Sequence, residues 1–289
     1  MGQIQAKVVE HSVSDQGIQL VTYQLAYPRF IHSEFMTHRV FSRNASSSRA
    51  IPVAKMIEQV RTDPAMPVHW GQNQPGMQAM AEIQHVGAAK DQWRRAANQA
   101  ADVAEEMMAL GLHKQVANRI LEPFQIIHVI VTATEWGNFF DLRKHKDADP
   151  NIYALATAID EAHSSSDPVS RGNNRHDALN WHLPYVTDDE RATNRENPLY
   201  LAKLSAARCA RVSYLTHDGK LPDPAKDLEL YERLVGSRPM HASPVEHQAY
   251  PDRRPIGSAE WFAENLHGNF RGWCQYRKLV EDDSRFRFR

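Results

Sequence analysis

The sequence is poor in cysteine and has no long apolar run. Only two cysteines, Cys209 and Cys274, occur in 289 residues, which is too few for a disulfide framework. Neither has a second cysteine at metal-ligand spacing, so we expect reduced thiols and no metal site. No stretch approaches the roughly 18 consecutive apolar residues of a membrane span, and the start lacks the apolar run of a signal peptide. We therefore expect a cytoplasmic protein with no membrane partner.

The sequence also lacks a charge excess of either sign. Its formal net charge is −1, which gives no general attraction to nucleic acids or anionic membranes. Nucleic acid is therefore not an expected partner, and any anion site must come from a local cluster of arginines. The length and the 42% of hydrophobic residues fit one large globular domain or two small ones.

The first half of the chain alternates between regular and irregular patterns. Residues rich in β-branched and aromatic types predict a strand over 18–31 that ends near Pro28. Apolar residues at three- and four-residue spacing predict helices. The predicted segments are a short helix at 33–38, a loop at 42–49, a helix opened by Pro52, an irregular excursion at 63–79, a helix at 90–110, a long helical region at 114–143 broken near Pro123, and a helix from 150 to 163.

A polar stretch divides the chain into two parts. Residues 166–200 are rich in Asn, Asp, Arg and Ser and read as a connection between a part at 1–165 and a part at 201–289. The more apolar 181–185 within the connection should dock onto the body. The second part should contain helices through 208, at 227–235 and at 259–280. Residues 26–29 (Ala-Tyr-Pro-Arg) are echoed by Ala-Tyr-Pro at 249–251, which leaves a partial internal duplication open.

The most informative segment is 37–49, which holds three arginines, a histidine, an asparagine and four serines. Guanidinium groups bind phosphate in a two-point geometry, and hydroxyls and loop N–H groups add donors. The segment therefore predicts an anion-binding loop, with a solvated polar turn as the alternative.

This segment resembles the signature of flavin-dependent thymidylate synthases, which reads Arg-His-Arg, two residues, Ser, one residue, Asn-Glu, one residue, Ser, one residue, Arg. Matching residues are His38, Arg39, Ser42, Asn44, Ser47 and Arg49. Residues 116–123 and 138–143 are similar to two further segments of the family. The resemblance implies that Arg143 is catalytic, stabilising negative charge on the uracil ring. It implies a substrate site made of Ser47, Ser48, Arg49, Arg119, Arg143 and Glu34.

The second part resembles the same family out of order. Residues 210–214, 241–247 and 271–277 are similar to motifs that normally precede or include the signature, so the chain looks like a rearranged or partly duplicated member. The implied flavin contacts are His38, Arg39, Asn44, Asn138, His241, Ser243 and Arg277. Other residues replace the family's residues at Glu34, Thr37, Ala45, Thr132 and Thr134, which leaves open whether FAD is retained.

The resemblance implies an α/β (α+β) fold with an antiparallel sheet flanked by long helices. The implied reaction is reductive methylation of dUMP to dTMP, with FAD as cofactor and methylenetetrahydrofolate and NADPH as co-substrates. It also implies a homo-oligomer, either a tetramer or a dimer with pseudo-fourfold architecture. Three alternatives stay open: hydroxymethylation of dUMP or dCMP, a non-catalytic nucleotide-binding relative, and nucleic-acid binding through the alternating Arg and Phe of 285–289.

Overall fold

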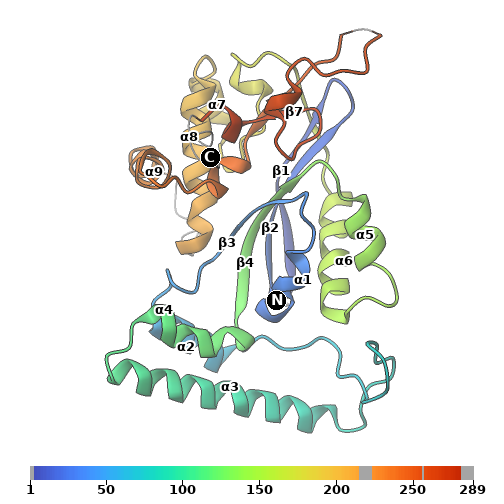
Figure 1. The fold of residues 1–289 in the computed structure, drawn as a ribbon, viewed down its shortest axis with the longest axis vertical. Coiled ribbons are helices and arrows are strands. Elements are labelled where there is room, and N and C mark those ends of the chain that lie inside the picture. Colours follow the sequence, from blue (N-terminus) through green and yellow to red (C-terminus); the bar gives the residue numbers. More distant parts are fainter. Residues whose placement is uncertain (1–2, 215–222, 256, 281–289) are drawn as a thin grey trace, which may run out of the picture.

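The computed structural model describes residues 3–214, 223–255 and 257–280 (Figure 1), so the alternating tail at 285–289 lies outside the described residues. Its centre is a five-stranded sheet of order β3-β4-β2-β1-β5. The strands are β1 (Gln5–Ser14), β2 (Gln19–Pro28), β3 (Ser42–Ala45), β4 (Ile126–Ala133) and β5 (Val169–Arg171). All pairings are antiparallel except that of β1 with β5. The expected α/β fold with an antiparallel sheet is confirmed, and β5 adds one parallel pair.

Alternation along β2 and β4 divides the sheet into two covered faces, because successive strand residues point to opposite sides. On one face, odd-numbered residues of β2 such as Val21 and Tyr23 join a core with α6 (Pro150–Ser164). The short α1 (His32–Phe35) and α5 (Gly137–Arg143) complete this layer. Their aromatic side chains, including Phe35 and Phe139, are fully buried there.

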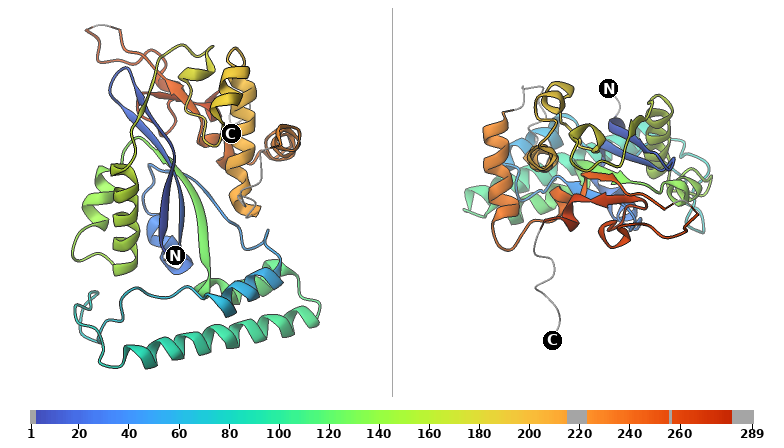
Figure 2. Two further views of the ribbon diagram at one scale, coloured as in Figure 1. Left: turned by 180° about the vertical axis from the view of Figure 1, so that it is seen from behind. Right: turned by 90° about the horizontal axis from the view of Figure 1, so that it is seen from above.

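The second part of the chain covers the opposite face. It contains α8 (Pro198–Ala210), α9 (Pro224–Tyr231) and a two-stranded sheet of β6 (Ala249–Pro251) and β7 (Trp273–Gln275). The connecting residues add α7 (Asp188–Thr193), whose Glu190 pairs with Arg208 of α8. Ile130 of β4 packs on Cys209 near the end of α8 and on Val212 just beyond it. Figure 2 shows this part and the α5–α6 layer on opposite sides of the sheet. The expected docking of 181–185 is confirmed by the buried Trp181.

A third layer lies beyond one end of the sheet (Figure 1). It is formed by α2 (Val53–Thr62), the long α3 (Val86–Ala109), α4 (Lys114–Ala117) and the 3-10 segment η2 (Asn118–Phe124). Small residues of α3 at four- and three-residue spacing, Ala97, Ala101 and Ala104, bury one stripe of the helix against α2 and η2. None of the helices in the described ranges is long and apolar enough to cross a membrane.

Three of the predicted elements are wrong. The helical region expected at 114–143 is interrupted by β4, because the run Ile126–Ala133 is rich in β-branched residues and pairs on both sides. Part of the loop expected at 42–49 is strand β3, paired with β4. The helix expected at 259–280 is replaced by short 3-10 turns and β7, since Gly268 and Gly272 adopt positive φ and interrupt any helix there.

Other predicted elements are confirmed, including the strand that ends at Pro28 and the helices α2, α3 and α6. Strand β1 was not predicted. The division at 165 and 200 stays a prediction, and the connecting residues contribute β5 and α7.

Candidate functional site

The loop after β3 meets η2 at a single carboxylate. Oε1 of Glu122 accepts hydrogen bonds from Ser48 Oγ at 2.8 Å and from Arg119 at 3.1 Å, and it pairs with Arg29 at 3.2 Å. Asn118 donates to the carbonyl oxygens of Ser48 and Ile51 and so fixes the path of the loop. We call Ser47, Ser48, Arg49, Arg119, Arg29 and Glu122 the signature-loop group.

The signature-loop group carries an excess of positive charge. Two arginines, Arg29 and Arg119, pair with the one carboxylate of Glu122, and the exposed Arg49 adds a third positive charge on the same loop as Ser48. Burial, together with the neighbouring Arg119, lowers the pKa of Arg29, while Glu122 opposes this effect. Converging guanidinium groups that one carboxylate cannot neutralise suit a dianionic phosphate. Of the residues predicted for the substrate site, the structure links Ser48 and Arg119 through Glu122, with Ser47 and Arg49 next to Ser48 in the chain. Arg29 and Glu122 were not among the predicted residues.

Arg143 lies elsewhere, at the end of α5 over α1. Its Nε donates to His38 Nε2 at 3.0 Å, and its terminal nitrogens donate to Glu34 at 3.2 Å and to Thr37 at 3.2 Å. Arg43 braces the same turn by donating to the carbonyl oxygens of Met36 and His38. We call Glu34, Thr37, His38, Arg43 and Arg143 the α1–α5 group. Glu34 and Arg143 line a cavity of about 1170 Å³.

Burial sets the protonation of this second group. Burial, Arg143 and Arg43 all lower the pKa of His38, so the ring is neutral near pH 7 and its Nε2 accepts from Arg143. Burial and Asp149 raise the pKa of Glu34, while Arg143 lowers it. The guanidinium of Arg143 is thereby held in a fixed orientation with part of its surface open to the cavity.

The two groups do not meet within one chain. In Figure 1, α4 lies beyond one end of the sheet, whereas α5 lies beside the sheet together with α6. The structure brings Arg29 and Arg119 together at Glu122, whereas Arg143 contacts His38, Glu34 and Thr37 instead. A single chain thus presents two separate candidate half-sites, one around Glu122 and one around Arg143.

The second part folds back onto β3, as the resemblance requires. Ser243 donates to the amide oxygen of Asn44 at 3.2 Å, and the amide nitrogen of Asn44 donates to the carbonyl of Cys209 at 2.8 Å. Gln275 of β7 donates to Ser42 at 3.1 Å. The predicted neighbours Asn44 and Ser243 are therefore brought together through β3.

The residues expected to hold FAD do not form one cradle in this chain. His38 Nε2 accepts a hydrogen bond from Arg143, and the side-chain amide of Asn44 is hydrogen-bonded to Cys209 and Ser243. Arg277 is paired with Glu246. The remaining expected contacts are exposed at separate places: Arg39 beyond α1, Asn138 on α5 and His241 before the turn at 243–246. One chain alone therefore does not fit the flavin.

Thr132, which stands where the family has an asparagine, serves a buried chain of hydrogen bonds instead. Arg171 donates to Ser12, which bonds His182 at 2.9 Å. His182 bonds Thr22 at 2.8 Å, Thr22 bonds Thr132 at 2.6 Å, and Thr132 bonds His247 at 2.8 Å. Burial lowers the pKa of His182 to about 4 and that of His247 to about 3. Both rings are therefore neutral, and this network ties the second part to the sheet.

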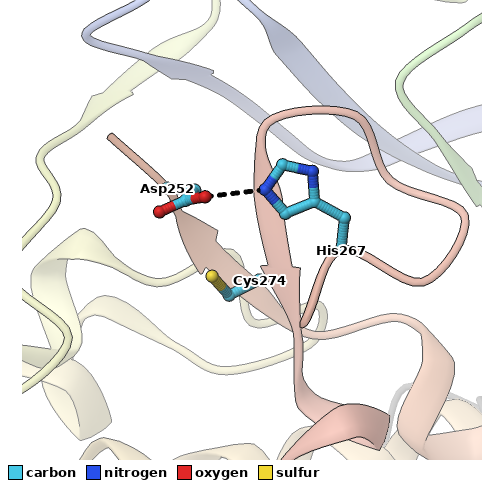
Figure 3. Close-up of side chains that lie close together, drawn as sticks. All are labelled: Asp252, His267 and Cys274. Carbon is cyan, nitrogen blue, oxygen red and sulfur yellow. Dashed lines mark hydrogen bonds and ion pairs between the residues drawn. The ribbon is translucent and has the colours of Figure 1, made fainter. Parts of the chain in front are cut away.

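Three potential metal ligands, Asp252, His267 and Cys274, lie together between β6 and β7 (Figure 3). The backbone N–H of Gly272 donates to His267 Nδ1 at 3.2 Å, so the ring proton is on Nε2, which donates to Asp252 at 2.8 Å. A metal at Nε2 would have to displace that proton and that bond. We assign this cluster to holding the β6–β7 turn.

The comparisons with known proteins point to one family. A family model described as thymidylate synthase complementing protein matches residues 11–169. Among solved structures, the UMP/dUMP methylase PolB from Streptomyces cacaoi bound with 5-Br UMP is 17% identical, with a TM-score of 0.46, over 57% of this chain and 90% of that chain. The same methylase bound with 5-Br dUMP is 16% identical, with a TM-score of 0.46, over 57% and 91%. No curated protein matches.

Proposed function

Since the family match covers more than half of its residues, the chain belongs to the thymidylate synthase complementing proteins, and on this premise we propose that it methylates dUMP to dTMP. The observation that carries the proposal is that the match spans both half-sites. The signature-loop group and the α1–α5 group all fall between residues 29 and 143.

The chemistry of the two half-sites supports binding of different parts of the nucleotide. The signature-loop group supplies guanidinium and hydroxyl donors for the phosphate end of the nucleotide. Arg143 supplies donors for the carbonyl groups of the base and stabilises negative charge that develops on the ring. Hydrogen bonds to the neutral ring of His38 and to the carboxylate of Glu34 hold the guanidinium group of Arg143 in place. Little reorganisation of this group is therefore needed when the substrate binds.

Because the two half-sites lie apart in one chain, we propose that the complete site forms between two copies. The signature-loop group of one subunit would face the α1–α5 group of another in a homo-oligomer. A closed symmetric assembly repeats such a shared site at every equivalent interface. The same arrangement would bring flavin contacts from different chains together, which a single chain does not do.

We propose FAD as cofactor, with methylenetetrahydrofolate and NADPH as co-substrates. The expected contacts, among them Arg39, Asn138 and His241, would hold the flavin between chains, and the flavin would supply reducing equivalents for the transfer of the one-carbon unit. The thiols of the protein support a route without a cysteine nucleophile. Burial raises the pKa of Cys274 to about 11 and raises that of Cys209 further, so both stay protonated near pH 7.

A visible spectrum of the purified protein, recorded with and without dUMP, tests the proposal. We expect a flavin absorption band that dUMP perturbs, and a product mass that corresponds to dTMP. A product heavier by one oxygen would favour hydroxymethylation of dUMP. A colourless protein that binds dUMP would favour the non-catalytic relative, and a protein that binds no pyrimidine nucleotide would refute the assignment.

A further inference from the structure

Residues 69–83 form a hairpin in the segment that the sequence predicts only as an irregular excursion. Gly71 and Glu82 form an antiparallel bridge, flanked by backbone bonds from Gln72 to Ala81 at 2.6 Å and from Ile83 to Trp70 at 2.9 Å. A Cβ added to Gly71 would lie 2.3 Å from the Cβ of Ala79. Only glycine therefore allows the two arms to approach this closely.

The base of this hairpin is anchored to two helices. The N–H of Val68 donates to the Asn151 side chain at the start of α6 at 2.8 Å. Trp70 packs edge-on against Trp93 of α3, with ring centroids 6.0 Å apart. His69 donates to the carbonyl oxygen of Ala79 at 2.8 Å and joins the arms. The anchored base fixes the position of the hairpin relative to α6.

The hairpin is one wall of the cavity that contains Arg143. His69, Gly71 and residues 77–80 of the hairpin line this cavity together with Glu34 and Arg143. Met77 is 97% exposed and Met80 is 68% exposed, although methionine side chains are usually buried. The volume of about 1170 Å³ exceeds the usual range for small-molecule pockets, roughly 300–1,000 Å³. The cavity therefore has room for more than a single pyrimidine ring.

The charges of the residues that line the Arg143 cavity indicate which class of ligand it would bind. Carboxylates outnumber cations in the lining, with Glu34, Asp141, Asp147 and Asp149 against Arg143 and Lys146. Such a lining disfavours a phosphate and favours a group that offers N–H donors. Thioether side chains are flexible and polarizable and pack well on flat rings.

We propose that the 69–83 hairpin is a substrate-contacting wall of the Arg143 cavity. Met77 and Met80 pack on the face of a flat nitrogen heterocycle whose N–H groups face the carboxylates. The inference rests on the proposed function and assigns specificity to residues outside the family signature. The shared chemistry has two sources in that reaction, the pyrimidine base of the nucleotide and the reduced pterin of the carbon donor.

Titrations of a Met77→Ser/Met80→Ser double variant of the full chain test this wall. Calorimetry with dUMP and, separately, with tetrahydrofolate should show a Kd raised about 10-fold or more for at least one ligand, because two apolar contacts are lost. The ligand whose Kd rises identifies the source of the ring. Gly71→Ala should raise the Kd of the same ligand, because it disturbs the close approach of the hairpin arms without removing a side chain that contacts the ligand.

Met108→Ser is the matched control, since Met108 is 42% exposed on α3 and does not line the cavity. It should leave both Kd values within about twofold. Unchanged binding in the double variant would overturn the inference, as would a changed oligomer mass in light scattering with unchanged Kd values, which would make the methionines a subunit contact. If the wild-type chain binds neither ligand, the proposed function fails and this inference fails with it.

Discussion

Replacing Arg143 with alanine should damage both stability and nucleotide binding. Arg143 is 19% exposed and donates to His38, Glu34 and Thr37 at 3.0 to 3.2 Å. Three hydrogen bonds at about 0.5–1.5 kcal/mol each set a range of roughly 1.5–4.5 kcal/mol. Since Glu34 and Thr37 are partly open to solvent, the lower end applies, and we expect a loss of about 2 kcal/mol in the free energy of unfolding.

Urea unfolding measures the stability loss, and Arg94→Ala is the control. Arg94 pairs with Asp91 at the same 3.2 Å distance but is 55% exposed, so its loss should cost no more than about 0.5 kcal/mol. Calorimetry with dUMP should then show a Kd raised at least about 10-fold for Arg143→Ala, because charge-assisted bonds contribute roughly 1.5–3 kcal/mol. Wild-type affinity and a wild-type single-turnover rate in Arg143→Ala would refute the role of this side chain.

Three further predictions concern residues outside the α1–α5 group. Glu122→Ala should weaken dUMP binding about 10-fold, because the arginines that converge on its carboxylate lose their alignment; unchanged calorimetric Kd values would contradict this. Asp227→Asn should cost about 3 kcal/mol in urea unfolding, because Asp227 is 1% exposed and pairs with the buried Arg208; a loss below about 1 kcal/mol would be inconsistent with that pairing. Between pH 6.5 and about 4 the folded state binds fewer protons than the unfolded state at His182. Stability should therefore fall on acidification through that window, and His182→Gln should flatten the fall.

The sequence predicts the candidate site best where its residues are close together in the chain. The signature segment predicts Ser47, Ser48 and Arg49 as site residues, and the structure links Ser48 to Arg119 through Glu122. The organising role of Glu122 could not be read from the sequence, because an acid three residues after Arg119 is equally typical of a surface helical pair. What distinguishes it is the long-range approach of Ser48 and Arg29.

The prediction of secondary structure from the sequence is wrong where helical and strand patterns cannot be told apart. β4 was read as part of a helix because its apolar run is short and follows a helical segment, and periodicity alone does not separate a buried strand from a buried helix. The 69–83 hairpin was recognised only as irregular, since its shape depends on the close approach of Gly71 to Ala79 and on anchors from α3 and α6.

The account depends on a nucleotide site shared between subunits, and a mixing experiment tests that claim most directly. Arg119→Ala and Arg143→Ala chains, each weak in dUMP binding alone, are unfolded together, refolded and titrated with dUMP. Random pairing in a symmetric oligomer should restore wild-type affinity to about a quarter of the sites. A mixture that binds no better than the two separate variants would contradict the shared site.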